Sequence, residues 1–247
     1  MRADTLVWEE YRDEIANRVV VLPAGSMEQH GPHLPLNVDV VIPENLANMV
    51  AERINGMVLP TLAYGYKSHP TSGGGQLFPG TTSLNGITLI HLVLDILSET
   101  YRHGGRRFLL LNGHYENLAF ISEAVELFME KAEEARIVVL SWWDQVSQEM
   151  IDELFREAGF PGWDTEHAGI TETALMQYFS PKTVREDKII DDQSERKPAY
   201  SVYPPPADVI PKSGVLYKAT YASREKGEKL AKHIVETIVG VVKTELG

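Results

Sequence analysis

The stretch RFLLLNGHYEN (107–117) joins a short apolar run directly to a polar turn. Its four consecutive apolar residues, Phe108 to Leu111, are typical of a strand that is buried on both faces. A helical pattern of apolar residues then runs from Asn117 to Glu134. A buried strand followed at once by a helix is one half of a β-α-β unit, in which the two strands run parallel.

The same alternation of short apolar runs and helical patterns recurs along the chain. Further strands are expected over Val19–Leu22, where Pro23 ends the run, over Met57–Leu59 and over Ile137–Leu140. The other expected helices cover Asp4–Asn17, Pro43–Ile54, Ile87–Tyr101, Ile170–Tyr178 and Ser223–Leu246. We therefore predict an α/β fold with a mostly parallel β-sheet flanked by helices on both faces.

No boundary between domains is visible in the sequence. The segment Lys182–Gly214 is polar and rich in proline, as a linker would be. Too little chain follows it to form a second core, so we expect a surface excursion instead. Residues 1–247 are predicted to form a single domain.

The composition narrows the possible classes of function. The 247 residues include no cysteine, which excludes disulfides, thiolate metal sites and cysteine nucleophiles, so a bound metal would need His, Asp or Glu ligands. A net charge of −12 argues against a nucleic-acid partner. Acidic residues stand where a signal peptide would have its apolar core, and no apolar run approaches the roughly 20 residues of a membrane span. We expect a cytoplasmic protein with no membrane partner.

Polar residues follow three of the expected strands where each strand ends. They lie in Gly25–Asp39, Asn112–Asn117 and Ser141–Asp144. Ligands of an open α/β sheet bind at the carboxyl ends of its strands, so these segments are expected to share one site.

Two of these segments carry a carboxylate and an imidazole two residues apart. Glu28 and His30 form the first pair, and His114 and Glu116 form the second. In an extended stretch both members of such a pair point to the same side. With Asp39 they make five ligands of the kinds that zinc and manganese accept. One such pair alone says little. Two pairs at two strand ends make a centre of two metal ions bridged by Asp39 an equal alternative to residues that share no ligand.

A third polar cluster lies around the start of the helix expected from residue 170. Glu166, His167 and Glu172 belong to it, and the imidazole would exchange protons near neutral pH. The alternative is a capped helix with solvated acids. Trp143 and Trp163 flank the cluster and are either core residues or the walls of a pocket for a flat ligand.

Other features point less clearly to chemistry. Ser72–Gly75 is a flexible loop without the lysine of a P-loop, and it either lines the site or a subunit contact or is a plain turn. His33 is a further possible ligand. Four remaining histidines are interpreted as surface or core residues: His69, His91, His103 and His233.

Several segments together resemble the creatininase family, in order and over nearly the whole chain. They are GSMEQHGPHLPLNVD (25–39), YGYKSHPTSGGGQLFPGTTS (64–83), LNGHYEN (111–117), SWWD (141–144), GWDTEHAGITETALM (162–176) and ASREKGE (222–228). The resemblance implies one α/β domain, a homohexamer, and a binuclear centre of zinc with zinc or manganese. One metal would be bound by Glu28, Asp39 and His114, and the other by His30, Asp39 and Glu116.

The resemblance also implies reversible hydrolysis of creatinine to creatine. A metal-bridging hydroxide would attack the ring carbonyl, and His167 would carry the proton to the leaving nitrogen. Glu116 is expected to be catalytic as well as a metal ligand. Substrate contacts are expected from Ser72, Tyr115, Trp143, Trp163, Asp164 and His167. From their position beside this histidine, Glu166 and Glu172 are expected to orient it or the metal ligands.

The segment near His69, Thr71 and Leu77 departs from the family pattern, which leaves the substrate open. The family includes enzymes that open other cyclic or formyl amides or cyclic inosose-type diketones. A non-catalytic assembly protein stabilised by metal is a third reading, although such a protein has no need of a proton shuttle.

Overall fold

The centre of the molecule is a four-stranded sheet in which every strand runs parallel to its neighbours. The strands are β1 (Val19–Ala24), β2 (Gly56–Val58), β3 (Arg107–Asn112) and β4 (Arg136–Ser141), in the spatial order β2-β1-β3-β4. Val20 pairs with Met57 on one side and with Phe108 on the other, and Phe108 pairs in turn with Ile137. The structure is a computed structural model that describes residues 1–247, the side chain at position 207 excepted.

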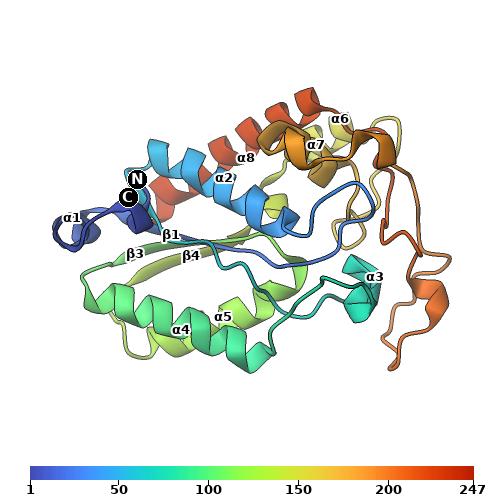
Figure 1. The fold of residues 1–247 in the computed structure, drawn as a ribbon. Coiled ribbons are helices and arrows are strands. Elements are labelled where there is room, and N and C mark those ends of the chain that lie inside the picture. Colours follow the sequence, from blue (N-terminus) through green and yellow to red (C-terminus); the bar gives the residue numbers. More distant parts are fainter.

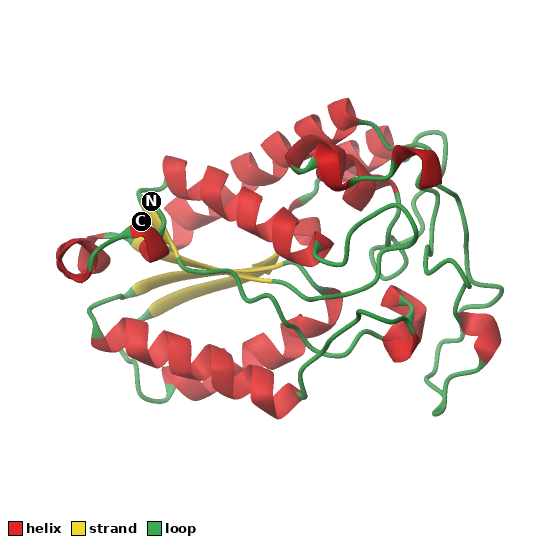
Figure 2. Ribbon diagram, in the orientation of Figure 1, coloured by secondary structure: helices red, strands yellow, loops and turns green.

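Helices cover both faces of this sheet (Figures 1 and 2). The helices α2 (Val38–Arg53), α7 (Ile170–Phe179) and α8 (Arg224–Glu245) pack on one face, where α6 (Gln148–Leu154) joins them. The helices α4 (Gly86–Arg102) and α5 (Leu118–Met129) cover the other face. Two apolar cores therefore lie above and below the strands, which confirms the predicted α/β class.

The expected strands are all present, with one difference at Pro23. This residue lies inside β1, opposite Leu111, and does not end the strand. Its carbonyl accepts a hydrogen bond from the N–H of Leu62, at 3.0 Å. The backbone nitrogen of Pro23 therefore faces the β2 side of β1, where β2 has already ended. A proline, which has no N–H, costs the sheet no hydrogen bond at that position.

The first turn of α2 differs from the expected helix Pro43–Ile54. The helix begins at Val38, which brings Asp39 into its first turn and leaves Pro43 inside the helix. Proline cannot donate to the carbonyl of Asp39 four residues earlier. That carbonyl instead faces two strand ends, where a Cβ on Gly25 or Gly113 would lie 2.2 Å or 2.7 Å from it. Two glycines thus let the helix approach the carboxyl edge of the sheet.

The N-terminal segment is more broken than the expected helix Asp4–Asn17. Only α1 (Trp8–Glu14) is α-helical, between short 3-10 turns, and Val7 just before it is exposed. The expected helix Asn117–Glu134 is also shorter, because α5 ends at Met129. The short helices α3 (Pro70–Gly73) and α6 had no counterpart in the sequence prediction.

The C-terminal helix and the segment before it agree with expectation. The side chain of Ser223 caps α8 by accepting from the N–H of Lys226. Residues 182–214 form no α-helix and contain only 3-10 turns, and they run along the surface beside α3 (Figure 1). Among the described residues, no helix has both the length and the apolar character of a transmembrane segment.

Candidate metal centre

Buried polar side chains gather at the carboxyl edge of the sheet, as the strand ends predicted. Glu28 and His30 lie in the loop after β1, and His114 and Glu116 lie after β3. Asp39 reaches the same place from the first turn of α2, whose N-terminal end favours a carboxylate. No more than 3% of Glu28, His30, Asp39 or His114 is exposed, so their charges and lone pairs need partners inside the protein.

Asp39 lies between the two histidines. Its Oδ1 is 3.1 Å from His30 Nε2, and its Oδ2 is 3.0 Å from His114 Nδ1. Burial alone would raise the pKa of this carboxyl, but the charges of His30 and His114, together with the hydrogen bond of His114, hold it well below its usual value. Asp39 is therefore an anion with one oxygen directed at each imidazole.

Backbone carbonyls fix which nitrogen of each imidazole carries a hydrogen. His114 Nε2 lies 3.0 Å from the carbonyl of Tyr66, and His30 Nδ1 lies 3.1 Å from the carbonyl of Glu28. A carbonyl only accepts, so these nitrogens donate. The opposite nitrogens, His30 Nε2 and His114 Nδ1, face the carboxylates. A cation bound among these carboxylates would therefore meet one nitrogen of each ring while the other nitrogen donates to a carbonyl, as in histidines that bind metals.

Two buried atoms in this cluster have no hydrogen-bond partner. They are Glu28 Oε1 and His30 Nε2, the second of which is close to Asp39 but without hydrogen-bond geometry. Unpartnered acceptors of this kind are costly inside a protein unless a cation satisfies them. Carboxylates mixed with imidazoles suit zinc or manganese, so the donor set fits divalent metal ions.

Three groups of side chains have ligand atoms close enough to share one ion. They are Glu28 with Asp39 and His114, His30 with Asp39 and Glu172, and Glu28 with His30 and His167. The first is the set expected for one metal. The second contains His30 and Asp39 as expected for the other metal, but it is completed by Glu172 from α7.

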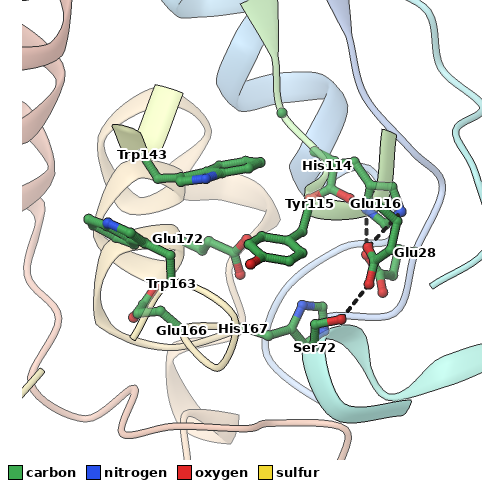
Figure 3. Close-up of a pocket in the computed structure, with 12 residues that line it drawn as sticks. Glu28, Ser72, His114, Tyr115, Glu116, Trp143, Trp163, Glu166, His167 and Glu172 are labelled. Atoms are coloured by element: carbon green, nitrogen blue, oxygen red, sulfur yellow. Dashed lines mark hydrogen bonds and ion pairs between the residues drawn. The ribbon is translucent and has the colours of Figure 1, made fainter. Parts of the chain in front are cut away.

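Glu116 lies on the far side of the His114 ring. Its Oε2 is 3.2 Å from His114 Nε2, and its Oε1 accepts from the hydroxyl of Ser72 and, at 3.0 Å, from the N–H of His69 (Figure 3). In this position it contacts His114 and the loop of α3. Its role as the third ligand of the second metal stays a prediction.

A small cavity opens beside the cluster, and it is lined by five of the six residues expected to contact substrate, all but Asp164. Its volume is about 30 Å³, close to that of one water molecule, and Trp163, His167 and Glu166 are among its lining residues. A wider groove of about 670 Å³ adjoins it and includes Asp164. Four residues line both spaces: Ser72, Tyr115, Glu116 and Trp143.

Aromatic rings form one side of this cavity. Figure 3 shows Trp143 and Trp163 on the side opposite His114 and Glu28. The ring of Tyr115 stacks on Trp143, with centroids 5.8 Å apart and planes inclined by 26°. Flat faces at the mouth suit a planar ligand.

The carboxylates near His167 support the chain around it. Glu166 accepts from the N–H and the hydroxyl of Thr171, and Glu172 accepts from the N–H of Ala168 at 2.6 Å. Burial, together with the charge of Glu172, raises the pKa of Glu166 to about 8. These contacts brace the turn that carries His167, whose ring lies 4.3 Å from that of His30.

The remaining histidines have other surroundings. His33 is fully buried beside the centre, and its Nε2 is 2.9 Å from the hydroxyl of Thr173. His69 lines the outer groove. His91 is exposed. His103 contacts the ring of Tyr11, and His233 accepts from the N–H of Ser147.

One buried residue of the site, Gln29, was not among the predicted site residues. It stands between Glu28 and His30 in the sequence. Its position between two candidate ligands was the only signal.

Comparisons with known proteins agree with this geometry. Residues 4–242 match a family model described as Creatininase: Creatinine amidohydrolase. The chain is 44% identical to the creatinine amidohydrolase of Pseudomonas putida, over 97% of this chain and 95% of the relative. It is 24% identical to the 3-dehydro-scyllo-inosose hydrolase of Thermotoga maritima, over 97% and 81%.

Solved structures extend the likeness to three dimensions. A creatininase variant complexed with creatine is 43% identical and superposes with a TM-score of 0.95, over 99% of this chain and 98% of that chain. A Zn–Zn type variant and a manganese form of creatininase have the same TM-score, at 43% and 44% identity. Both likenesses span 99% of this chain. They span 97% of the Zn–Zn type variant and 98% of the manganese form.

Proposed function

This chain belongs to the creatininase family, and from that premise we propose that it is a metal-dependent creatinine amidohydrolase. The reaction is the reversible hydrolysis of creatinine to creatine. The observation that carries the proposal is the buried group of Glu28, Asp39 and His114 in a fold that matches a creatine-bound creatininase.

Two divalent ions, zinc with zinc or manganese, fit this donor set. When bound, they supply Lewis acidity toward a carbonyl oxygen and lower the pKa of water. Glu28, Asp39 and His114 would hold one ion. His30 and Asp39 would hold the other, for which the family resemblance nominates Glu116 as the third ligand.

Glu172 is the second candidate for that third ligand. It lies with His30 and Asp39, and its Oε1 is 3.6 Å from His30 Nε2. In that case Glu116 stays between His114 and Ser72, where it contacts the imidazole and accepts from the hydroxyl. The two assignments predict different metal contents for the variants of each residue.

The protein side chains bind the ring and move the proton. His167 takes a proton from water as the water oxygen adds to the ring carbonyl carbon. It delivers that proton to the ring nitrogen as the bond between this carbon and this nitrogen breaks. Glu116 assists by accepting from Ser72 beside the reacting carbonyl. Ser72, Tyr115 and Asp164 contact polar atoms of the substrate.

Trp143 and Trp163 enclose the planar ring and keep bulk water away from it. Glu166 and Glu172 hold the turn before α7, so that His167 faces the cavity. The groove next to the small cavity admits the substrate, since four residues line both spaces.

The setting of the enzyme is also proposed. We place it in the cytoplasm as a homohexamer whose residues 1–247 form one catalytic unit, with neither nucleic acid nor membrane as a partner. Exposed apolar side chains on neighbouring helices support an interface between subunits, among them Ile87, Leu92 and Leu118. The net charge of −12 supports the absence of a nucleic-acid partner.

The test is a creatinine-to-creatine assay on purified protein, as isolated and after zinc or manganese is added, with metal content measured in parallel. Turnover with about two ions per chain supports the proposal. Two ions without turnover contradict creatinine as the substrate. The search then moves to other cyclic amides and to cyclic diketones, for which the Thermotoga maritima relative is the precedent.

A further inference from the structure

The amide of Gln29 joins three segments of chain around the candidate metal centre. Its Nε2 donates to the carbonyls of Gly73, at 3.0 Å, and Gly214, at 2.8 Å. Its Oε1 accepts from the N–H of Gly31 at 2.9 Å. Both amide hydrogens and the amide oxygen are therefore used, and 5% of the residue is exposed.

The main-chain carbonyl of the same residue fixes the state of His167. It lies 2.8 Å from His167 Nε2. A carbonyl only accepts, so Nε2 carries a hydrogen. Gln29 Nε2 is also 3.0 Å from this ring nitrogen, but both of its hydrogens already go to carbonyls, so this is a contact between donors.

The other ring nitrogen of His167, Nδ1, is available for proton transfer. Among the described residues no hydrogen bond uses Nδ1, and His167 lines the small cavity. The nitrogen that accepts and releases a proton is therefore Nδ1, which is held in place through Nε2.

Two glycines make room for the Gln29 amide. A Cβ on Gly214 would lie 1.9 Å from Gln29 Oε1, and one on Gly74 would lie 2.9 Å from Gln29 Nε2. Both glycines have positive φ angles, of 79° and 78°. Beyond Gly214, the N–H of Leu216 donates to the carbonyl of His167 at 3.1 Å, so the linked segment returns to the histidine.

We propose that Gln29 is a positioning residue that holds His167 Nδ1 and Ser72 at a fixed separation across the cavity. Its side chain secures the segment of Ser72 through the adjacent Gly73, while its carbonyl secures the ring of His167. This inference rests on the proposed function, because His167 transfers its proton in amide hydrolysis. Gln29 itself touches neither the substrate nor the reacting atoms.

The test replaces the amide with side chains of similar length. Gln29→Met removes all three hydrogen bonds, and Gln29→Glu keeps the acceptor but directs a carboxylate at two carbonyls. We expect kcat to fall by roughly 10- to 100-fold, because a small displacement of a proton-transfer group has a cost of that size. The fall in kcat should exceed any rise in KM that follows from movement of Ser72, and metal content should stay unchanged, since the candidate metal ligands remain. Gln148→Met on the exposed start of α6 is the matched control and should leave kcat unchanged.

Hydrogen exchange followed by mass spectrometry gives a readout that does not depend on activity. In Gln29→Met, amides in peptides spanning 68–78 and 211–217 should exchange faster than in the wild type, and those of β3 should not. Gly214→Ala displaces the amide from the other side and should reproduce both effects, whereas Gly240→Ala, with open space around its Cβ, should not.

Each outcome decides the inference. If the wild type turns over creatinine and Gln29→Met has the same kcat, the inference is wrong. It is also wrong if the kcat of Gln29→Met falls because the variant has lost metal. A wild type that turns over no creatinine overturns the proposed function instead. Even then, hydrogen exchange tests the structural part of the inference. If residues 68–78 and 211–217 exchange at the same rate in Gln29→Met and in the wild type, Gln29 does not hold these segments together.

Discussion

Asp39 Oδ2 lies 3.0 Å from His114 Nδ1, although 75 positions separate the two residues in the chain. The other carboxylate oxygen of Asp39 is equally close to His30. The carboxyl edge of the sheet makes this meeting possible, because it brings the end of β3 beside the first turn of α2. One carboxylate thereby serves both halves of the centre.

Loss of the Asp39 charge should therefore affect both ions together. In Asp39→Asn we expect the purified protein to retain neither, measured by plasma mass spectrometry after dialysis. Asp95→Asn, on the exposed face of α4, is the control and should keep the wild-type metal content. Two retained ions in Asp39→Asn would contradict a bridging role.

The third ligand of the second ion can be identified by comparing two variants. If Glu172 is that ligand, Glu172→Gln should lower the metal content to about one ion per chain, while Glu116→Gln keeps about two. The opposite pattern would restore Glu116 to the role that the family resemblance gives it. Because the amide is isosteric with the carboxylate, a difference between these variants reports charge and ligation more than packing.

His167 should matter for turnover and not for metal binding. We expect His167→Ala to lower kcat by about 10²- to 10⁴-fold, the usual contribution of a general acid or base. Metal content should remain that of the wild type, because Glu28, His30, Asp39 and His114 are intact. Unchanged hydrolysis by this variant would show that another group carries the proton.

Two glycines of α8 should respond in opposite directions to alanine. At Gly227 a Cβ would lie 1.9 Å from the carbonyl of Ala174, where α8 crosses α7. Gly227→Ala should lower the free energy of unfolding by about 3 kcal/mol, at the upper end for overpacking. At Gly240 the Cβ meets nothing, so Gly240→Ala should raise it by up to about 1 kcal/mol through helix propensity. Urea unfolding of both variants, measured at one protein concentration, tests the contrast.

His33 should make the protein less stable in acid. Burial, and then the charge of His30, lowers the pKa of His33 from 6.5 to about 4 in the folded state. The unfolded chain takes up a proton below pH 6.5 that the folded chain refuses, so stability falls as pH drops from 6.5 toward 4. The total loss is about 3 kcal/mol, of which about 2 kcal/mol has occurred by pH 5.

The measurement compares unfolding free energies of metal-free protein at pH 7.5 and pH 5. His33→Gln removes the titrating group and should reduce the difference between the two pH values by about 2 kcal/mol. An equal difference in the variant and the wild type would show that other groups account for the acid sensitivity.

The strands and the place of the site were predictable for a physical reason. Runs such as Phe108–Leu111 are apolar throughout because both faces of the sheet are covered, and polar residues follow where each strand leaves the core. Glu28, His30 and His114 stand directly after such runs. Their convergence therefore follows from parallel topology alone.

The parts that escaped prediction depend on contacts between distant segments. Pro43 appeared to start a helix, but glycines at two strand ends allow the helix to begin earlier and to carry Asp39. Glu172 lies with His30 only because α7 packs across α2. The role of Gln29 depends on two carbonyls that come from positions 73 and 214, and no local pattern in the sequence encodes such a meeting.

The all-parallel sheet also determines the order in which the protein folds and binds its metal ions. Its ligand-bearing segments are separated by whole crossovers, and contacts so far apart in the chain form late in folding. During synthesis no chain can assemble the group of His30, Asp39 and Glu172 until α7 has been made. The ions then bind only the finished fold, so each tenfold rise in their free concentration above the dissociation constant opposes unfolding by about 1.4 kcal/mol per ion.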